Sequence, residues 1–283
     1  RNSGTFVLNR DQGNVRLFKP RPDDPKGMYN ERTTCFFEDQ NGDVYMGSWD
    51  AGIRVVSNGS SIPSESGPTY KGSGDNALRD SIIQAIYRDD DGTFWVGMEA
   101  GLDLYNPETE QYRHIRHDPD NANSIAPLGV QSNCIVQDDK GNFWIGTWGG
   151  LTMMRPKDPG KSTFQTDYQY QRFISSREDT NSLSDSRIIS MHYNPENPGT
   201  LFVGTYGGGL NKIDINHENP AASQITTYTK SDGLSNNVIY GILEDEQGNL
   251  WMSTNKGLSR FNPTKETFTT FDANDGLQSS QFR

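Results

Sequence analysis

The sequence lacks several features that would mark a particular class of protein. No apolar run approaches the roughly 18 residues needed to cross a bilayer, and no signal peptide is recognisable. Lys and Arg number 26 against 37 Asp and Glu, for a formal net charge of −11, and they form no dense basic block. This balance argues against nucleic acid and anionic membranes as main partners. The two cysteines say little about the redox compartment.

The chain is instead rich in glycine and aromatic residues, and one pattern containing both recurs five times. Each copy has a turn glycine followed three positions later by a bulky residue, which is Tyr45, Trp95, Trp144, Phe202 or Trp251. A Gly-apolar pair follows each copy: Gly52-Ile53, Gly101-Leu102, Gly150-Leu151, Gly209-Leu210 and Gly257-Leu258. The turn glycines are separated by 50, 49, 58 and 49 residues. A period of this length indicates radially repeated β-units.

The last full copy predicts four short strands. An apolar run over 236–245 ends in acidic residues, a glycine turn follows, and 250–254 forms a second strand. A third strand over 258–261 ends at Asn262-Pro263, because proline cannot donate to a ladder. Residues 268–271 form the outer strand. Four antiparallel strands in under about fifty residues make one propeller blade, so the predicted fold class is an all-β β-propeller of four-stranded antiparallel blades.

The repeat predicts five complete blades with a partial blade at each end, all in one propeller body. The predicted bounds are 1–28 for the end of a preceding blade, 29–78, 79–128, 129–185, 186–235 and 236–274 for complete blades, and 275–283 for the start of another. Joined together, the two end pieces would still lack a second strand and most of a first. We therefore expect a segment of a longer propeller array.

Two positions in each repeat are expected to build the contacts between blades. Trp95, Trp144 and Trp251 are suited to fill the wedge between neighbouring blades, each burying roughly 200 Å². Ten residues before the bulky residue the side chain is small, at Cys35, Ala85, Cys134 and Gly241. Met191, eleven residues before Phe202, is assigned to this slot in the fourth blade, a departure that the sequence does not explain. The two cysteines are predicted to be reduced, buried and structural, because non-neighbouring blades do not bring them within disulfide range.

Two stretches carry the closest resemblance to a known family. Asp232-Gly233-Leu234-Ser235-Asn236-Asn237-Val238 and Gly141-Asn142-Phe143-Trp144-Ile145-Gly146-Thr147 resemble repeats of the two-component regulator propeller, the extracytoplasmic sensor of hybrid histidine kinases in Bacteroidetes-type bacteria. The resemblance covers essentially the whole chain. It implies a periplasmic location, glycan-derived ligands, dimerisation through the full-length receptor and a membrane-anchored parent protein with a kinase beyond this segment.

Nothing in the sequence predicts a catalytic, metal or cofactor site. His114 and His117 are expected to be solvated residues of one outer strand pointing to opposite faces, which disfavours joint chelation. The oxygen-rich segment 118–123 lacks the central glycine and terminal glutamate of a calcium loop, so a turn between blades is expected. The acidic pairs such as Asp138-Asp139 recur in register, which favours turn chemistry over catalysis. No His-supported nucleophile or unique carboxylate pair is present.

The candidate ligand site follows from the direction of the strands. The turns between second and third strands share one face with the segments that lead into each first strand, and their residues vary between blades. Variable residues on a regular scaffold are where recognition is usually located, and aromatic planes beside Arg and Asn suit a sugar ring with hydroxyl or acidic groups. The predicted ligand-binding residues are Trp49, Arg79, Glu99, Asn133, Trp148, Arg187, Tyr206, Asn237 and Lys256.

The favoured function is a non-enzymatic, ligand-sensing segment of a two-component receptor, binding an oligosaccharide or another small ligand. Two alternatives stay open. A propeller polysaccharide lyase or glycoside hydrolase would require one blade with a His/Tyr/Arg or paired-acid cluster. A protein-interaction scaffold would require a flat variable face that binds no sugar.

Overall fold

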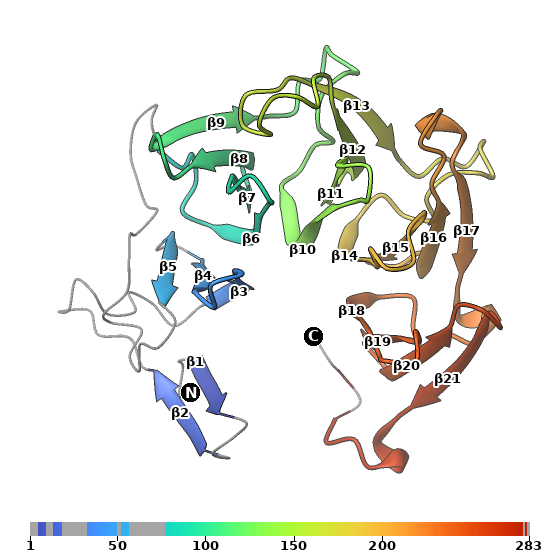
Figure 1. The fold of residues 1–283 in the computed structure, drawn as a ribbon. Coiled ribbons are helices and arrows are strands. Elements are labelled where there is room, and N and C mark those ends of the chain that lie inside the picture. Colours follow the sequence, from blue (N-terminus) through green and yellow to red (C-terminus); the bar gives the residue numbers. More distant parts are fainter. Residues whose placement is uncertain are drawn as a thin grey trace. The chain divides into compact units, whose positions relative to one another are not determined.

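The computed structural model describes residues 5–9, 14–18, 33–49, 52–56, 77–279 and 281. The chain divides into two compact units, Arg1–Ile115 and Arg116–Arg283, and their strands are labelled in Figure 1. Strands account for nearly all regular structure, and the described helices are short 3₁₀ turns, namely η2 (Pro220–Ala222), η3 (Lys230–Asp232) and η4 (Ala273–Asp275). The chain is therefore an all-β protein, as its sequence predicts.

The described residues of the first unit form three antiparallel sheets. A pair of strands, β1 (Thr5–Asn9) and β2 (Asn14–Phe18), corresponds to the predicted end of a preceding blade. The next sheet has the order β3 (Thr33–Glu38), β4 (Val44–Ser48) and β5 (Ile53–Val56), and the position of its predicted outer strand lies outside the described residues. The third sheet is four-stranded, with β6 (Ile83–Arg88), β7 (Phe94–Met98), β8 (Gly101–Asn106) and β9 (Gln111–Ile115) in sequence order.

The second unit contains three four-stranded antiparallel sheets, each with its strands in sequence order. The first consists of β10 (Val130–Gln137), β11 (Phe143–Thr147), β12 (Gly150–Pro156) and β13 (Tyr168–Phe173). The second consists of β14 (Ile188–Tyr193), β15 (Thr200–Thr205), β16 (Leu210–Asp214) and β17 (Gln224–Tyr228). The third consists of β18 (Ile239–Glu244), β19 (Leu250–Thr254), β20 (Gly257–Asn262) and β21 (Thr267–Phe271). Such sheets are the blades of a β-propeller, which confirms the predicted fold class.

The first strand of every blade is bulged, and the bulge aligns a small residue with the second glycine of the repeat. Register shifts fall between Thr33 and Cys35, Ile83 and Ala85, Val130 and Ile135, Ile188 and Ser190, and Ile239 and Gly241. The pairs that result include Cys35 with Gly47, Ala85 with Gly97, Ser190 with Gly204 and Gly241 with Ser253. The assignment of Met191 to the small slot was therefore wrong. The turn before Phe202 is longer, so counting back from the bulky residue misses Ser190.

The second glycine of the repeat is needed because neighbouring blades meet there. A Cβ at Gly146 would lie 2.7 Å from Cγ2 of Ile188, on the first strand of the next blade, and 3.0 Å from Cβ of Cys134. A Cβ at Gly47 would lie 2.8 Å from Cγ2 of Ile83, again on the next blade. The glycine thus lets the bulged first strand of one blade approach the second strand of the blade before it.

The bulky residue of the repeat fills the wedge between blades, as predicted for Trp144. Trp144 is fully buried in a cluster with Ile188, Met191, Leu201 and Val203 of the following sheet. Trp95 is also fully buried. Trp251 is only half-buried, because β18–β21 is the last of the four-stranded sheets of its unit. Its ring stacks on Phe271 of its own blade, with the ring centroids 5.1 Å apart.

The recurring acidic residues hold both the first turn of each blade and the wedge tryptophan. One carboxylate oxygen of Asp138 accepts the backbone N–H groups of Lys140 and Asn142, and the other accepts the indole N–H of Trp144 at 3.0 Å. The equivalent indole bonds join Trp95 to Asp89 at 2.6 Å and Trp251 to Asp245 at 2.8 Å. Turn chemistry is therefore confirmed as the role of these acids, and the bond to tryptophan is an addition to it.

The indole bond makes a pH prediction for the last blade. The bond from Trp251 is the main reason that the pKa of Asp245 falls from 3.8 to about 2. A lowered pKa in the folded state contributes stability that is complete above the unfolded value of 3.8 and is lost as the pH falls through about 2. We expect Trp251→Phe to return this pKa toward 3.8, measured by an NMR titration of the Asp245 carboxyl carbon. An unchanged midpoint would contradict the role given to the indole, and Trp148→Phe is the control.

A second recurring bond anchors the segment that leads into each first strand. The residue after each Gly-Leu pair is polar, and it accepts a backbone N–H from that segment. The pairs are Arg79 N–H to Asp103 Oδ2 at 3.0 Å, Ala126 N–H to Thr152 Oγ1 at 2.9 Å, Ser184 N–H to Asn211 Oδ1 at 3.0 Å and Ser235 N–H to Ser259 Oγ at 3.0 Å. These bonds fix the backbone from which the candidate site residues project.

The two cysteines are free and buried, as predicted. Burial raises the pKa of the Cys35 thiol to about 12, and it raises the pKa of Cys134 as well. Both side chains face the repeat glycines, Gly47 and Gly146. Their role is to fill the narrow slot beneath those glycines.

Candidate functional site: an aromatic–arginine ledge

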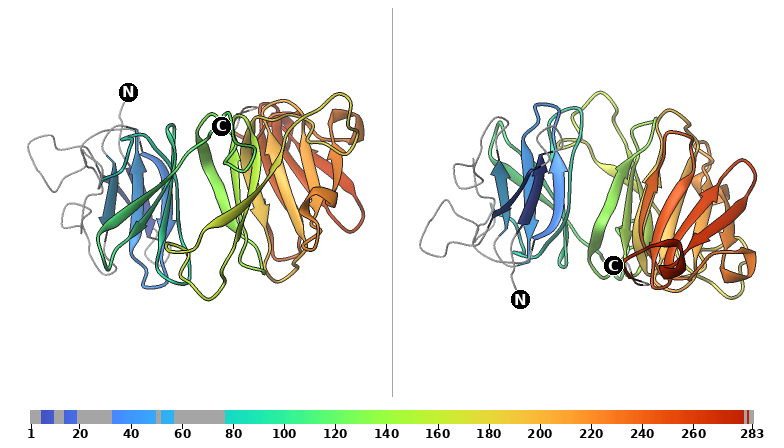
Figure 2. Two further views of the ribbon diagram at one scale, coloured as in Figure 1. Left: turned by 90° about the horizontal axis from the view of Figure 1, so that it is seen from above. Right: turned by 90° about the horizontal axis from the view of Figure 1, so that it is seen from below.

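The candidate residues lie where the second strands end and where the chain leads into the first strands. In side view, the strands of β14–β17 and β18–β21 run between two opposite edges of the second unit, and the turns lie along those edges (Figure 2). Trp148, Tyr206 and Lys256 belong to the turns after β11, β15 and β19, and Arg187 immediately precedes β14. Strand alternation brings these positions to the same edge of their unit.

Three of the predicted residues form one cluster, which we call the aromatic–arginine ledge: Trp148, Arg187 and Tyr206. The rings of Trp148 and Tyr206 are tilted by 48° with centroids 5.2 Å apart. The guanidinium carbon of Arg187 lies 5.2 Å from the centroid of the Tyr206 ring. Tyr206 is 39% exposed, and the side chain of Arg187 is 45% exposed. Two aromatic planes and a cation from adjacent blades therefore face solvent together.

Asp185 holds the arginine of the ledge in place and was not among the predicted residues. Its Oδ1 accepts from Nε of Arg187 at 3.0 Å, and its Oδ2 accepts from Nη2 at 2.5 Å. Burial alone would raise the pKa of Asp185, but the bonds from Arg187 outweigh it and lower that pKa. Because this fork fixes the guanidinium plane, Nη1 is the part of Arg187 left for a ligand. The Asp-x-Arg spacing was the available signal in the sequence.

The backbone around Trp148 is unusually constrained. Leu128 has a left-handed φ of 69° and is 70% exposed, and its carbonyl accepts the backbone N–H of Trp148 at 3.2 Å. A Cβ at Gly149 would lie 2.5 Å from Cγ of Pro127. A bulky apolar residue in the left-handed region costs free energy, and such strain clusters at functional sites. Leu128 thus belongs to this surface, although no sequence pattern indicated it.

The other predicted residues of the second unit lie outside the ledge. Asn133 is exposed within the bulge of β10, with a φ of 54°. The side chain of Asn237 accepts the backbone N–H of Lys230 at 2.9 Å, and its carbonyl accepts that of Gly209 at 3.0 Å. Lys256 is exposed. Asn237 is therefore tied into the turn before β18, which gives it a structural role.

The predicted residues of the first unit are also exposed at the equivalent positions. Trp49 follows β4 and is 40% exposed, while Glu99 follows β7 and Arg79 precedes β6. Arg79 is anchored through its backbone to the buried Asp103. In the ledge, by contrast, the contacts of Trp148, Arg187 and Tyr206 with one another are defined. The ledge is therefore the candidate with the best-defined geometry.

The histidines make structural contacts that the sequence did not predict. Nδ1 of His114 lies 2.8 Å from Oδ1 of Asp103, which is fully buried, so His114 is not simply solvated. His117 follows β9, rather than lying within it, and its Nδ1 is 2.8 Å from the carbonyl of Ile125. Segment 118–123 forms a turn closed by Asn121 N–H to the carbonyl of Asp118 at 3.2 Å. Within the described ranges, no group of three His, Cys, Asp or Glu is arranged to hold a metal ion.

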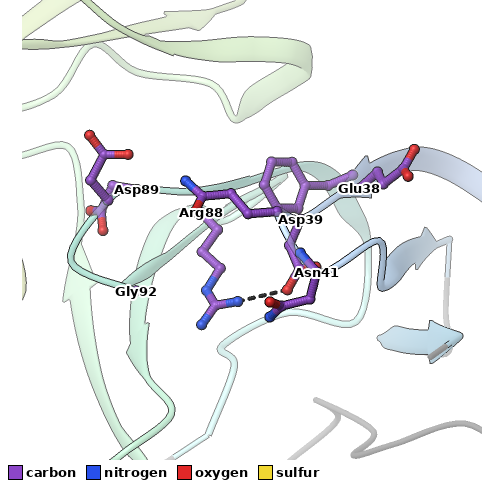
Figure 3. A pocket seen from close by; sticks show the side chains of 9 residues that line it. Glu38, Asp39, Asn41, Arg88, Asp89 and Gly92 are labelled. Carbon is purple, nitrogen blue, oxygen red and sulfur yellow. Dashed lines mark hydrogen bonds and ion pairs between the residues drawn. The ribbon is translucent and has the colours of Figure 1, made fainter. Parts of the chain in front are cut away.

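A small pocket lies at the opposite edge of the first unit, beside the first turns of two blades. It encloses about 190 Å³ and is lined by residues including Phe37, Asp39, Asn41, Arg88 and Gly92. Nη1 of Arg88 donates to Oδ2 of Asp39 at 2.7 Å across the pocket (Figure 3). The ring of Phe94 lies 5.1 Å from the guanidinium carbon of Arg88. The cation is thus paired within the protein, and the contact joins β6 to the turn after β3.

Comparison with a protein family identifies the repeats. Residues 77–100, 127–149 and 233–256 match the two-component regulator propeller family. These segments contain the lead-in residues, the first two strands and the second turn of three different blades. The matched segments therefore include six of the nine predicted ligand-binding residues, namely Arg79, Glu99, Asn133, Trp148, Asn237 and Lys256.

Two proteins with signalling descriptions are similar to the chain. The chain is 26% identical over 211 residues to a protein described as histidine kinase P4 of Formosa agariphila, covering 73% of this chain and 14% of that protein. A solved extracellular domain of a putative hybrid two-component system from B. thetaiotaomicron is similar with a TM-score of 0.70 at 16% identity, covering 99% of this chain and 36% of that one. The chain thus spans only a minor part of either relative.

A propeller enzyme is also similar in fold. The structure of streptogramin B lyase matches with a TM-score of 0.60 at 14% identity, covering 98% of this chain and 77% of that one. At this identity the likeness shows the shared propeller fold alone. In the described part of the chain, no helix is long and apolar enough to span a membrane.

Proposed function

Because the chain carries repeats of the two-component regulator propeller family, we propose that it is a non-enzymatic, ligand-sensing part of a two-component receptor. The proposal places it in the periplasm, in a membrane-anchored parent protein that dimerises and carries the output domain. The relative described as a histidine kinase and the similar extracellular domain of a hybrid two-component system support this assignment. The ligand proposed is an oligosaccharide derived from a glycan.

The observation that carries the binding proposal is the aromatic–arginine ledge. The exposed ring of Tyr206 and the partly buried ring of Trp148 offer two neighbouring planes that suit the C–H face of a sugar ring. Arg187, fixed by Asp185, offers a donor for a ring hydroxyl or carboxylate beside those planes. The three side chains project from anchored turns, so little conformational entropy is lost when a ligand binds.

A propeller polysaccharide lyase or glycoside hydrolase is the second candidate, and streptogramin B lyase is a propeller enzyme of similar fold. The ledge contains no histidine, and its carboxylate, Asp185, is paired with Arg187. It therefore offers no imidazole and no unpaired carboxylate as general acid or base. Binding without turnover is therefore the function that this geometry supports best. Incubation of the chain with the bound oligosaccharide, followed by mass spectrometry, should return the sugar intact.

The test of the binding proposal uses the double variant Trp148→Ala/Arg187→Ala. A printed array of neutral and acidic oligosaccharides first selects a binding sugar, and calorimetry then measures its affinity. Loss of the Trp148 indole and the Arg187 guanidinium is expected to weaken binding of the sugar at least about tenfold, equivalent to about 1.4 kcal/mol. The melting temperature should not change, because both side chains are partly exposed.

Two further variants separate a ledge effect from a general one. Lys265→Ala removes an exposed cation from the turn between β20 and β21, at the opposite edge, and should leave binding unchanged. Tyr206→Phe keeps the aromatic plane and should retain most of the affinity. Binding that survives the double variant would refute the ledge as the ligand site while leaving the fold untouched.

A further inference from the structure

The fourth blade departs from the repeat at the face that packs on the fifth. Its bulky residue is Phe202, where three other blades have tryptophan, and the residue opposite Phe202 in register is Lys212. The equivalent residues are Val55, Leu104 and Met153 in the first three blades and Arg260 in the fifth, where it lies over the Trp251 ring. A smaller aromatic residue and a lysine thus replace the usual wedge.

Both residues line a pocket between β14–β17 and β18–β21. The pocket encloses about 270 Å³, which is just below the size range of drug-sized ligand sites and fits a small molecule. Phe202, Leu250 and Pro263 form its apolar part. Asn197, Thr200, Lys212, Gln247 and Thr264 supply its polar part. It lies beside the turns after β14 and β18, at the edge opposite the ledge.

Lys212 is the charged group of this pocket, and its side chain is only 22% exposed. Its Nζ lies 3.6 Å from Oδ1 of Asp214 and 3.8 Å from Oε1 of Glu266. Both distances exceed the roughly 2.7–3.2 Å of an N–H···O hydrogen bond. In the first unit, by contrast, Arg88 is paired with Asp39 at 2.7 Å (Figure 3). Lys212 is therefore held by two long ion pairs and by no short hydrogen bond from its ammonium to either carboxylate, so its N–H groups keep the capacity to donate to a further anion.

The carboxylate nearest the pocket is already occupied. Oε2 of Glu244 lies 2.6 Å from Nε2 of His192, and its Oε1 accepts from Nδ2 of Asn194 at 2.8 Å. Asn194 stands where other blades have the aspartate that holds tryptophan, so its amide is available for this contact. Glu244 therefore closes one wall of the pocket and does not compete for the ammonium of Lys212.

We propose that this pocket is a second ligand site, which binds a small polyhydroxylated carboxylate of the size of a uronic acid monosaccharide. The ammonium of Lys212 binds the carboxylate, while the amides of Asn197 and Gln247 and the hydroxyl of Thr200 bind ligand hydroxyls. A single negative charge suits the site better than a doubly charged phosphate, because Asp214, Glu244 and Glu266 are all nearby. Phe202 and Leu250 contact the ring.

The test measures glucuronate binding by NMR titration of the whole chain, with glucose as the neutral control and inorganic phosphate as the anion control. Glucuronate is expected to shift the amides of Asn197, Thr200 and Gln247, whereas glucose and phosphate should bind at least tenfold more weakly. The key variant is Lys212→Met, which restores the type of residue found at Met153. It should weaken glucuronate binding at least tenfold while leaving the unfolding midpoint unchanged or higher, because an apolar side chain fills the pocket.

Two further variants keep the result unambiguous. Gln247→Ala changes an exposed turn residue and should weaken binding of glucuronate without affecting folding. The ledge variant Trp148→Ala/Arg187→Ala should bind glucuronate as the unchanged chain does, so failure of one site is distinguishable from failure of the other. Equal binding of glucose and glucuronate, preference for phosphate, or full binding by Lys212→Met would each overturn the proposal.

Discussion

Replacing Trp144 with alanine is expected to lower the free energy of unfolding by about 3–5 kcal/mol. The indole is fully buried between β10–β13 and β14–β17, where it contacts both sheets. Its removal also takes a hydrogen bond from the buried carboxylate of Asp138. Chemical denaturation monitored by circular dichroism measures the change.

Two other tryptophans provide matched controls for this loss. Trp251→Ala should cost less, because Trp251 is only half-buried although it occupies the same repeat position and makes the same indole bond. Trp148→Ala should cost least, since Trp148 projects from a turn. A denaturation midpoint that Trp144→Ala leaves unchanged would contradict the wedge role.

Adding one methyl group at Gly146 is expected to destabilise the protein by about 1–3 kcal/mol. The new Cβ would lie 2.7 Å from Cγ2 of Ile188, 3.0 Å from Cβ of Cys134 and 3.1 Å from Sδ of Met191. Ile188 and Cys134 belong to first strands of adjacent blades, so relief requires the blades to separate. Thermal unfolding of Gly146→Ala measures the effect.

A double-mutant cycle identifies the blade contact as the cause. In an Ile188→Ala background, the added cost of Gly146→Ala should fall, because the nearest colliding atom is gone. Ser253→Ala is the control, since the fifth blade already carries a side chain at this position and has Gly241 opposite; it should change stability by less than about 0.5 kcal/mol. A cost at Gly146 that is independent of Ile188 would exclude the proposed collision.

The blade structure could be predicted from the sequence because it depends on local signals. Glycine turns and strand-ending residues such as Pro263 determine the conformation of only a few neighbouring residues. The glycine turns and the strand patterns also recur in register. The small slot at Met191 was misassigned because the longer turn before Phe202 shifts the count, and only the pairing of Ser190 with Gly204 corrects it. The bond from Asp to Trp was overlooked, although both residues recur with a separation of six positions.

The candidate site was less predictable, because it depends on which side chains meet across blades. Strand alternation correctly brought Trp148, Arg187 and Tyr206 to one edge of the second unit. It could not show that their side chains touch, or that Asp185 fixes the arginine. The pocket at Lys212 went unnoticed because lysine in a strand usually faces solvent, whereas the register puts it opposite Phe202.

Hydrogen–deuterium exchange with the oligosaccharide selected on the array tests the central claim most directly. If the ledge is the sensing site, exchange should slow in the peptides that cover 147–150, 185–188 and 205–208, and it should be unchanged in 158–161, in the turn between β12 and β13. The slowing should disappear in Trp148→Ala/Arg187→Ala, and the sugar should be recovered uncleaved. Slowed exchange confined to the turns at the opposite edge, or cleavage of the sugar, would contradict a sensor that binds its ligand on the aromatic–arginine ledge.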